Sequence, residues 1–155
     1  MTEQMTAYQI ALPATGAREI KLSDYAGKWV VLYFYPKDNT PGCTTEGMNF
    51  RDLHEAFVAL NAVILGVSRD SVKSHENFKS KMTFPFDLLS DPDELLCNAM
   101  GVMKMKNMYG KQVRGVERST FLFSPTGELV KEWRGLKVPG HVDEVLATLK
   151  QLSGS

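Results

Sequence analysis

Two near-continuous apolar segments constrain this chain more than any other feature of its sequence. They are WVVLYFY, residues 29–35, and AVILGVS, residues 62–68, both rich in β-branched or aromatic residues. Such runs are typical of strands buried on both faces, as in the parallel part of a sheet. The segment between them has apolar residues at roughly helical spacing: Met48, Leu53, Phe57 and Leu60. Together these segments predict a βαβ unit whose first strand is central.

The remaining chain continues this alternation of strands and helices. It predicts a capped polar helix at 71–82, a short strand at 84–91, a helix at 91–102, a β-hairpin at 118–135 that turns at SPTG, and a closing helix at 139–152. In the helix at 91–102 we expect Asp91 as N-cap and Pro92 at the first position. The order predicts an α/β fold, a thioredoxin-like sandwich with a central mixed β-sheet flanked by helices, as a single domain over residues 1–155.

Charge and composition exclude several classes of partner. Eighteen basic residues balance eighteen acidic ones without a block of either sign, so neither nucleic acid nor a membrane is an expected partner. The N-terminus lacks a basic segment followed by an apolar core, which makes the cytoplasm the expected location. The two cysteines match no zinc spacing, and a reducing compartment disfavours a structural disulfide. We expect neither a metal nor an organic cofactor.

The segment after the first apolar run, PKDNTPGC, has the pattern of a strand exit followed by a helix start. Pro36 lacks an N–H to donate and so marks the end of the strand. Thr40 suits the N-cap, Pro41 the first helical position, and Gly42 allows a close approach to the backbone. Cys43 then falls in the first turn, where unpaired backbone N–H groups and the helix dipole favour a thiolate, the nucleophilic form of cysteine.

The helix terminus alone is too weak to ionise a thiol at neutral pH. It contributes about 0.3–2 kcal/mol, whereas lowering a thiol pKa by about 2.5 units takes roughly 3.4 kcal/mol. A nearby cation is therefore needed, and arginine is the natural candidate. A disulfide oxidoreductase of the thioredoxin type is a weak alternative, because it needs C-x-x-C and threonine stands at position 40.

These residues carry a resemblance to a known family. Pro36, Thr40 and Cys43 reproduce the P-x-x-x-T-x-x-C signature of peroxiredoxins, and FYPKDNTPGCTTEGMNFRD is similar to the bacterioferritin comigratory protein (BCP), or PrxQ, subfamily. Further matching stretches are LSDPDELLCNAMGV, RSTFLFSPTGELVKEWRG and VPGHVDEVL, so the resemblance covers most of the chain. The subfamily suggests a monomer or weak homodimer.

The resemblance implies a role for each matching residue. Cys43 resembles the peroxidatic cysteine, which attacks the peroxide O–O bond and becomes a sulfenic acid. Thr40 would hydrogen-bond the thiolate and peroxide oxygens, and Arg118 would favour the thiolate and the charge of the transition state. Pro36 would shield the site from water, and Glu46 would position arginine side chains. The implied substrates are hydrogen peroxide and small organic hydroperoxides.

The chain departs from the family pattern at the resolving cysteine. Many members of the subfamily place it five residues after the peroxidatic one, where this chain has Met48, and others place it in the helix that here reads ENFKSK. Cys97 is the remaining candidate. We favour a one-cysteine mechanism with an external thiol reductant: thioredoxin, glutaredoxin or a low-molecular-weight thiol. A two-cysteine peroxidase with Cys97 resolving, and a non-enzymatic redox sensor or holdase, stay open.

Two further groups of residues have less specific interpretations. MGVMKMKNMYGK, residues 100–111, holds four methionines, which predict flexible packing beside an active site rather than a soft-metal site. His54, His75 and His141 have no metal-ligand spacing and are expected at the surface or at helix caps.

Overall fold

The computed structural model describes residues 7–154 of the chain, apart from the side chain of Met108. The expectation for the N-terminus falls partly on residues 1–6, which lie outside the described residues. The strands are β1 (Leu12–Ala14), β2 (Arg18–Ile20), β3 (Trp29–Phe34), β4 (Ala62–Ser68), β5 (Asp87–Ser90), β6 (Met103–Met108), β7 (Lys111–Val116), β8 (Ser119–Phe123) and β9 (Leu129–Arg134). The helices are the 3-10 helix η1 (Leu22–Tyr25), α2 (Pro41–Asp52), α3 (His54–Ala59), α4 (Val72–Met82), α5 (Leu95–Ala99) and α6 (His141–Ser153).

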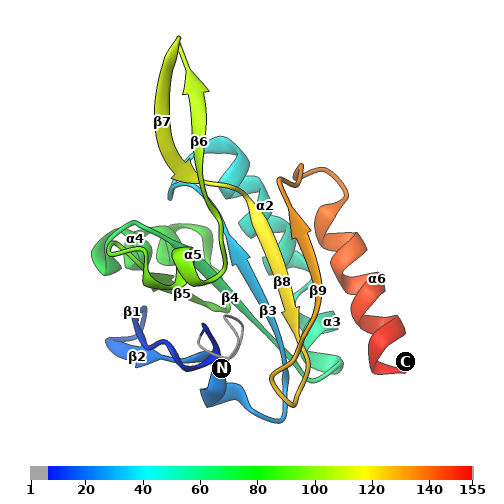
Figure 1. Cartoon of the computed structure of the whole chain (residues 1–155). Coiled ribbons are helices and arrows are strands. Elements are labelled where there is room, and N and C mark those ends of the chain that lie inside the picture. The colour runs from blue at the N-terminus through cyan, green and yellow to red at the C-terminus, as the bar shows by residue number, and fades with distance from the viewer. Residues whose placement is uncertain (1–6, 155) are drawn as a thin grey trace.

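A seven-stranded mixed sheet in the order β2-β1-β5-β4-β3-β8-β9 forms the centre of the molecule (Figure 1). Strand β3 pairs in parallel with β4 and antiparallel with β8, and β4 pairs in parallel with β5. The two apolar runs are therefore adjacent inner strands, and the predicted mixed sheet is confirmed. The predicted hairpin is also present, as the antiparallel pair β8–β9.

Alternating residues of the inner strands divide the core into two layers, as a sheet buried on both faces requires. The first layer contains Val30, Leu32 and Phe34 of β3 with Leu65, Val67, Leu89, Leu96, Cys97 and Phe121. The second contains Val31 and Tyr33 of β3 with Tyr35, Cys43, Phe50, Phe57, Phe78 and Val145. Helix α5 covers the first face and α2, α4 and α6 cover the second, so α5 lies in front of the strands in Figure 1 and α2 behind them.

Between β3 and β4 the chain forms two helices rather than the single one that the apolar spacing suggests. Leu53 leaves helical geometry, with φ −104° and ψ 7°, and separates α2 from α3. Gly47 inside α2 has a packing reason. A Cβ atom there would lie 2.4 Å from the ring of Phe84, so the glycine lets α2 approach the segment before β5.

The helix predicted at 91–102 begins later, which corrects the assignment of Pro92 to its first position. Glu94 has a left-handed conformation, with φ 60°, so regular helix starts only at Leu95. The N-cap residue is therefore Glu94 and not, as the sequence predicts, Asp91. The Asp91 carboxylate nevertheless accepts the backbone N–H groups of Leu95 and Cys97 in the first turn, each at 2.8 Å. By contrast, α4 lies within the predicted helix 71–82, and Ser71 caps it by accepting the N–H of Ser74.

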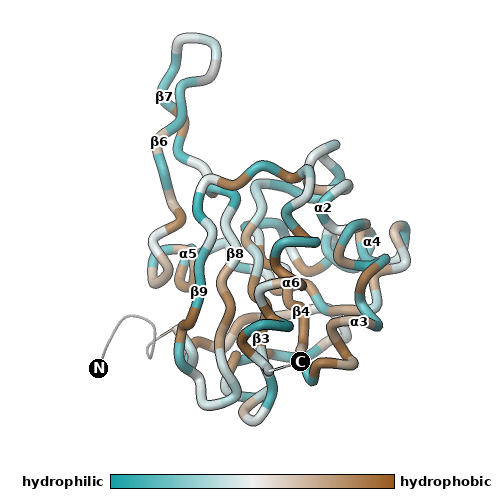
Figure 2. Tube along the Cα trace, turned by 90° about the vertical axis from the view of Figure 1, so that its right-hand side faces the viewer, coloured by the Kyte–Doolittle hydropathy of each residue, from teal (hydrophilic) through white to brown (hydrophobic). Residues whose placement is uncertain are grey.

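The methionine-rich segment forms most of a projecting hairpin, β6–β7 (Figure 1). It packs only in part as predicted, because Met103 at the start of β6 is half-buried against the core. Met105 is 60% exposed, whereas Met100, before the hairpin, belongs to the core. Lysines alternate with the methionines in β6, so the hairpin is largely hydrophilic, in contrast to the apolar inner strands (Figure 2). Within residues 7–154, no helix is long and apolar enough to cross a membrane.

Candidate active site

Cys43 lies in the first turn of α2, where the sequence predicts it. Thr40 is the N-cap and Pro41 the first helical residue. The thiol is almost completely buried, and its Sγ accepts a hydrogen bond from Arg118 Nη2 at 3.4 Å. Sheet register explains this contact. Phe34, the last residue of β3, pairs with Ser119, the first of β8, so Arg118 lies beside the loop that leads into α2.

Arg118 also binds Glu46, one helical turn after Cys43. Its Nη1 lies 2.7 Å from Glu46 Oε1, and the carboxylate is fully buried. One guanidinium therefore donates to a carboxylate and to the thiol at once, which its rigid fork permits. Burial by itself lowers the pKa of Arg118. The negative charges of Glu46 and Cys43 and their hydrogen bonds outweigh this effect, so the pKa is raised overall and the guanidinium stays charged. The predicted arginine and acid thus meet at the predicted cysteine.

Gly42 provides the close approach that the sequence suggests. A Cβ atom at this position would lie 3.1 Å from Arg118 Nη2, the same nitrogen that contacts Cys43. A side chain at this position would therefore crowd the guanidinium nitrogen that contacts the thiol.

Thr40 and Pro36 lie in the loop that joins β3 to α2, and both are half-buried. Thr40 occupies the N-cap position of α2, but its hydroxyl accepts no hydrogen bond from a backbone N–H of the helix. The hydroxyl donates its proton to the carbonyl of Lys37 at 2.8 Å, so towards any other group it acts as an acceptor. In this conformation it therefore does not donate to the Cys43 thiolate, a hydrogen bond that is part of the role that the resemblance implies. Pro36 follows Tyr35, whose N–H makes the last bond from this strand, to Val67 at 3.1 Å.

Glu46 and Tyr33 have buried oxygen atoms without hydrogen-bond partners among the described residues: Glu46 Oε2 and the Tyr33 hydroxyl. Burial, followed by the charge of Glu46, raises the pKa of Tyr33 well above its usual value. Burial likewise raises the pKa of Glu46 to about 7, although the charge and hydrogen bond of Arg118 oppose this effect. The sequence did not indicate that the Tyr33 hydroxyl lies near this site, because an aromatic residue in a buried strand is also typical of simple packing.

The raised pKa of Glu46 predicts a pH-dependent stability. Its carboxyl binds a proton more tightly in the folded state than in the unfolded state, where its pKa is 4.5. Stability from this group is therefore present below pH 4.5 and is lost as pH rises to 7, by about 3 kcal/mol. Urea unfolding at pH 5 and pH 8 should show this loss in the wild type relative to Glu46→Gln. The exposed Glu132→Gln provides the control, and an unchanged difference between wild type and Glu46→Gln at the two pH values would contradict the assignment.

Cys97 lies in the other core layer, so the sheet separates it from Cys43. Its side chain is fully buried. Burial, together with the nearby Asp91 carboxylate, raises the pKa of the Cys97 thiol far above its usual range. Both cysteines are free thiols. In this conformation Cys97 is neither ionised nor next to Cys43.

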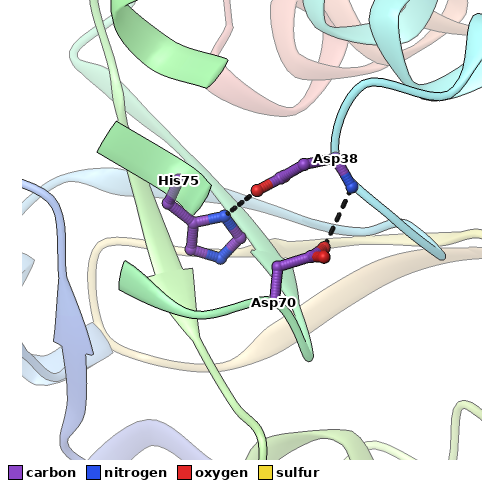
Figure 3. Close-up of side chains that lie close together, drawn as sticks. All are labelled: Asp38, Asp70 and His75. Atoms are coloured by element: carbon purple, nitrogen blue, oxygen red, sulfur yellow. Dashed lines mark hydrogen bonds and ion pairs between the residues drawn. The ribbon is translucent and has the colours of Figure 1, made fainter. Parts of the chain in front are cut away.

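The histidine expectations are partly wrong. His75 and His141 are buried, at 0% and 5% exposure, whereas His54 is half-buried. His141 bonds Thr120 at 2.8 Å, and burial lowers its pKa to about 4. His75 belongs to the one cluster within residues 7–154 whose side chains have metal-ligand chemistry, together with Asp38 and Asp70 (Figure 3). Sequence spacing did not reveal it, because its members come from separate segments.

A thioredoxin-like sheet that holds a cysteine in a helix's first turn against an arginine defines a class: thioredoxin-fold proteins with a nucleophilic thiol. Comparisons with known proteins are more specific. The AhpC/TSA family profile matches residues 4–132. The chain is 58% identical to peroxiredoxin Bcp of Xanthomonas campestris over 143 residues, 92% of this chain and 89% of that protein. It is 53% identical to peroxiredoxin Bcp of Bacillus subtilis over 147 residues, 95% and 94% of the two chains.

A solved structure of the Xanthomonas campestris bacterioferritin comigratory protein matches with a TM-score of 0.92 at 55% identity, covering 96% of this chain and 95% of that one. The chain therefore belongs to the AhpC/TSA family, as a peroxiredoxin of the BCP/PrxQ subfamily. It is accordingly a thiol peroxidase, an enzyme that reduces a peroxide at the expense of a thiol.

Proposed function

We propose that residues 1–155 form a single-domain, one-cysteine peroxidase in which Cys43 is the peroxidatic residue. The 3.4 Å contact between Cys43 Sγ and Arg118 Nη2 carries this proposal. The thiolate attacks one oxygen of ROOH, the O–O bond breaks, and the departing oxygen takes up a proton to form ROH. Cys43 becomes a sulfenic acid. Two external thiols then return it to the thiol, releasing water and a disulfide.

Four other residues would serve this reaction. Arg118 would stabilise the thiolate and the charge that develops on the peroxide oxygens, and Glu46 would fix the guanidinium in place. Thr40, whose own proton goes to Lys37, is suited to accept the O–H of the incoming hydroperoxide. Pro36 would limit the access of water.

The one-cysteine assignment is supported by the surroundings of Cys97. A disulfide needs Cα atoms within about 7 Å of each other. Cys97 packs in the opposite layer from Cys43, so pairing within one chain would require α5 and α2 to leave their places. The two-cysteine alternative therefore demands local unfolding, or pairing with a cysteine of another chain, in every cycle. A non-enzymatic sensor or holdase would form the same sulfenic acid but turn over slowly.

The proposed substrates are hydrogen peroxide and small organic hydroperoxides, and the Xanthomonas campestris relative is described as having alkyl peroxide reduction activity. We propose thioredoxin, glutaredoxin or a low-molecular-weight thiol as reductant, because each supplies the two electrons without a metal. We further propose that the protein acts as a monomer or weak homodimer.

Intact-protein mass spectrometry after one equivalent of hydrogen peroxide tests this proposal directly. We expect a gain of one oxygen, trapped by dimedone on Cys43, while Cys97 can still be alkylated after unfolding. A loss of two hydrogens, with a peptide joining Cys43 to Cys97, would instead assign the two-cysteine mechanism. No reaction at Cys43 would reject the peroxidatic assignment.

A further inference from the structure

The loop between β3 and α2 is held by a buried polar cluster that contains no residue of the Cys43 site. Asp38 lies in this loop between Pro36 and Thr40 and is only 5% exposed. Its carboxylate accepts hydrogen bonds from the Tyr35 hydroxyl at 2.6 Å, the Ser74 hydroxyl at 2.8 Å and His75 Nδ1 at 2.7 Å. Three donors thus converge on one carboxylate, two of them from the first turns of α4.

The neighbours of His75 determine its protonation state. Its Nε2 lies 2.9 Å from the carbonyl of Leu89 in β5, and its Nδ1 faces the Asp38 carboxylate. A carbonyl and a carboxylate only accept, so both ring nitrogens must donate, and the ring is an imidazolium. Burial raises the pKa of Asp38, but the hydrogen bonds and charge of His75 and the hydroxyl hydrogen bonds outweigh this and lower it. The pair is therefore ionic and fully buried.

Asp70 completes the cluster after β4. Its carboxylate accepts the backbone N–H of Asp38 at 2.9 Å and the hydroxyl of Ser68 at 2.5 Å, and Figure 3 shows Asp38 linked to both Asp70 and His75. Among the described residues, the titratable groups that contact or face the His75 ring are Asp38 from the loop, Asp70 from the β4–α4 connection and Tyr35 after β3. The loop is thus bonded through backbone and side chain to α4, β5 and the end of β4.

A bound metal is a poorer account of this cluster than a direct ion pair. Two ligands of a tetrahedral zinc ion lie roughly 3.4 Å apart, given metal–ligand distances near 2.1 Å. Asp38 and His75 are separated by only 2.7 Å, the distance of a charge-assisted hydrogen bond. The Asp38 oxygens and both ring nitrogens also have protein partners already.

We propose that the Asp38–His75 pair is a positioning element for the peroxidase site, which tethers residues 36–40 so that Cys43 Sγ stays against Arg118. The argument is geometric. Arg118 approaches the thiol from β8, on one side of β3, whereas the tether fixes the loop from α4 and β5, on the other. Releasing the loop would let the first turn of α2 move relative to the guanidinium. Neither member of the pair contacts Cys43 in the contacts described, so both act through the backbone.

Stopped-flow reaction with hydrogen peroxide and the pH profile of iodoacetamide alkylation test the tether in Asp38→Ala and His75→Phe. We expect the rate of Cys43 with peroxide to fall at least tenfold, and the half-maximal alkylation rate to move to higher pH. Asp38→Asn should retain most activity, because its amide can donate to a neutral His75 while its oxygen still accepts from Tyr35. Asp91→Ala removes another buried carboxylate, on the opposite face near α5, and should change stability without changing either readout.

Several outcomes would overturn the tether. Folded Asp38→Ala and His75→Phe variants with wild-type rate and alkylation profile would do so, as would an equal change in Asp91→Ala. A wild-type measurement covers the case in which these variants do not fold: two-bond ¹H–¹⁵N NMR should show both His75 nitrogens protonated at pH 7, and a neutral ring would reject the ion pair. Stoichiometric metal in the purified protein, with loss of rate on chelation, would also reject it.

This inference rests on the proposed role of Cys43, but the two fail differently. A wild-type protein whose Cys43 does not react with peroxide rejects the proposed function. Wild-type reactivity that the tether variants share rejects the tether alone. Alkylation of Cys43 does not involve peroxide, so it reports on the thiol in either case.

Discussion

Replacement of Cys43 by serine is expected to reduce peroxide turnover by more than about 1,000-fold, because a neutral hydroxyl without an adjacent base is a far poorer nucleophile than a thiolate. Cys97→Ser is expected to keep most of the activity, since Cys97 is buried in the opposite core layer and takes no part in the one-cysteine cycle. The measurement is hydrogen peroxide consumption with excess dithiothreitol, followed by the same assay with thioredoxin and with glutaredoxin.

Stability and mechanism must be separated in the Cys97 variant. A hydroxyl is more polar than a thiol, and burying it in this apolar site costs about 1–3 kcal/mol of stability. Cys97→Ala therefore serves as a second replacement, without a polar group. Loss of thioredoxin-dependent turnover in both folded Cys97 variants would contradict the one-cysteine mechanism. Retention in both, with loss in Cys43→Ser, is the expected pattern.

The inner strands and α4 were predictable because short-range pattern determines them. A continuous apolar run can satisfy its side chains only when both faces are covered, so strands at 29–35 and 62–68 followed directly from the sequence. The position of Cys43 was predictable for a similar reason, since Thr40 and Pro41 are local signals of a helix start. In each case the relevant interactions lie within a few residues along the chain.

Features that depend on contacts between residues far apart in the chain could not be predicted from the sequence. The start of α5 depends on the left-handed Glu94, which no local pattern requires. His75 looks like a solvated helix residue in sequence, but Asp38 and Leu89, from two other segments, give its ring nitrogens buried partners. The choice of Arg118 over other arginines came from family resemblance, and its physical basis, the pairing of Phe34 with Ser119, appears only in the sheet register.

The β6–β7 hairpin is a further case in which the sequence did not predict how side chains pack. Its alternation of methionine and lysine has the period of a strand, but its methionine content suggested flexible packing beside an active site. Among the described residues its two strands pair with each other in a separate two-stranded sheet, so Met105 in the middle of β6 is exposed, whereas Met103 at its start packs against the core.

Arg118→Met is the second change with a large expected effect. Loss of the guanidinium removes the one charged donor to Cys43 Sγ among the described contacts and the positive charge that would face the reacting oxygens. Removal of a single donor to a developing oxyanion lowers enzymatic rates by about 100- to 1,000-fold, and we expect a loss in this range for the reaction of Cys43 with hydrogen peroxide. Arg118→Lys should lose less, because it keeps the charge but not the fork that reaches thiol and carboxylate together.

Glu46 loses its ion-pair partner in Arg118→Met, so the loss of rate with peroxide must be separated from a loss of stability. Arg118→Met leaves the Glu46 carboxylate buried without its cation, which costs stability when that group is ionised. Because burial already raises the pKa of Glu46 to about 7, loss of the cation should let the carboxyl hold a proton at neutral pH. The double variant Arg118→Met/Glu46→Gln should therefore unfold at similar urea concentrations at pH 6 and pH 8, yet remain as slow with peroxide as Arg118→Met. Recovery of the rate in the double variant would mean that Arg118 serves only to neutralise Glu46 and has no direct part at the thiolate.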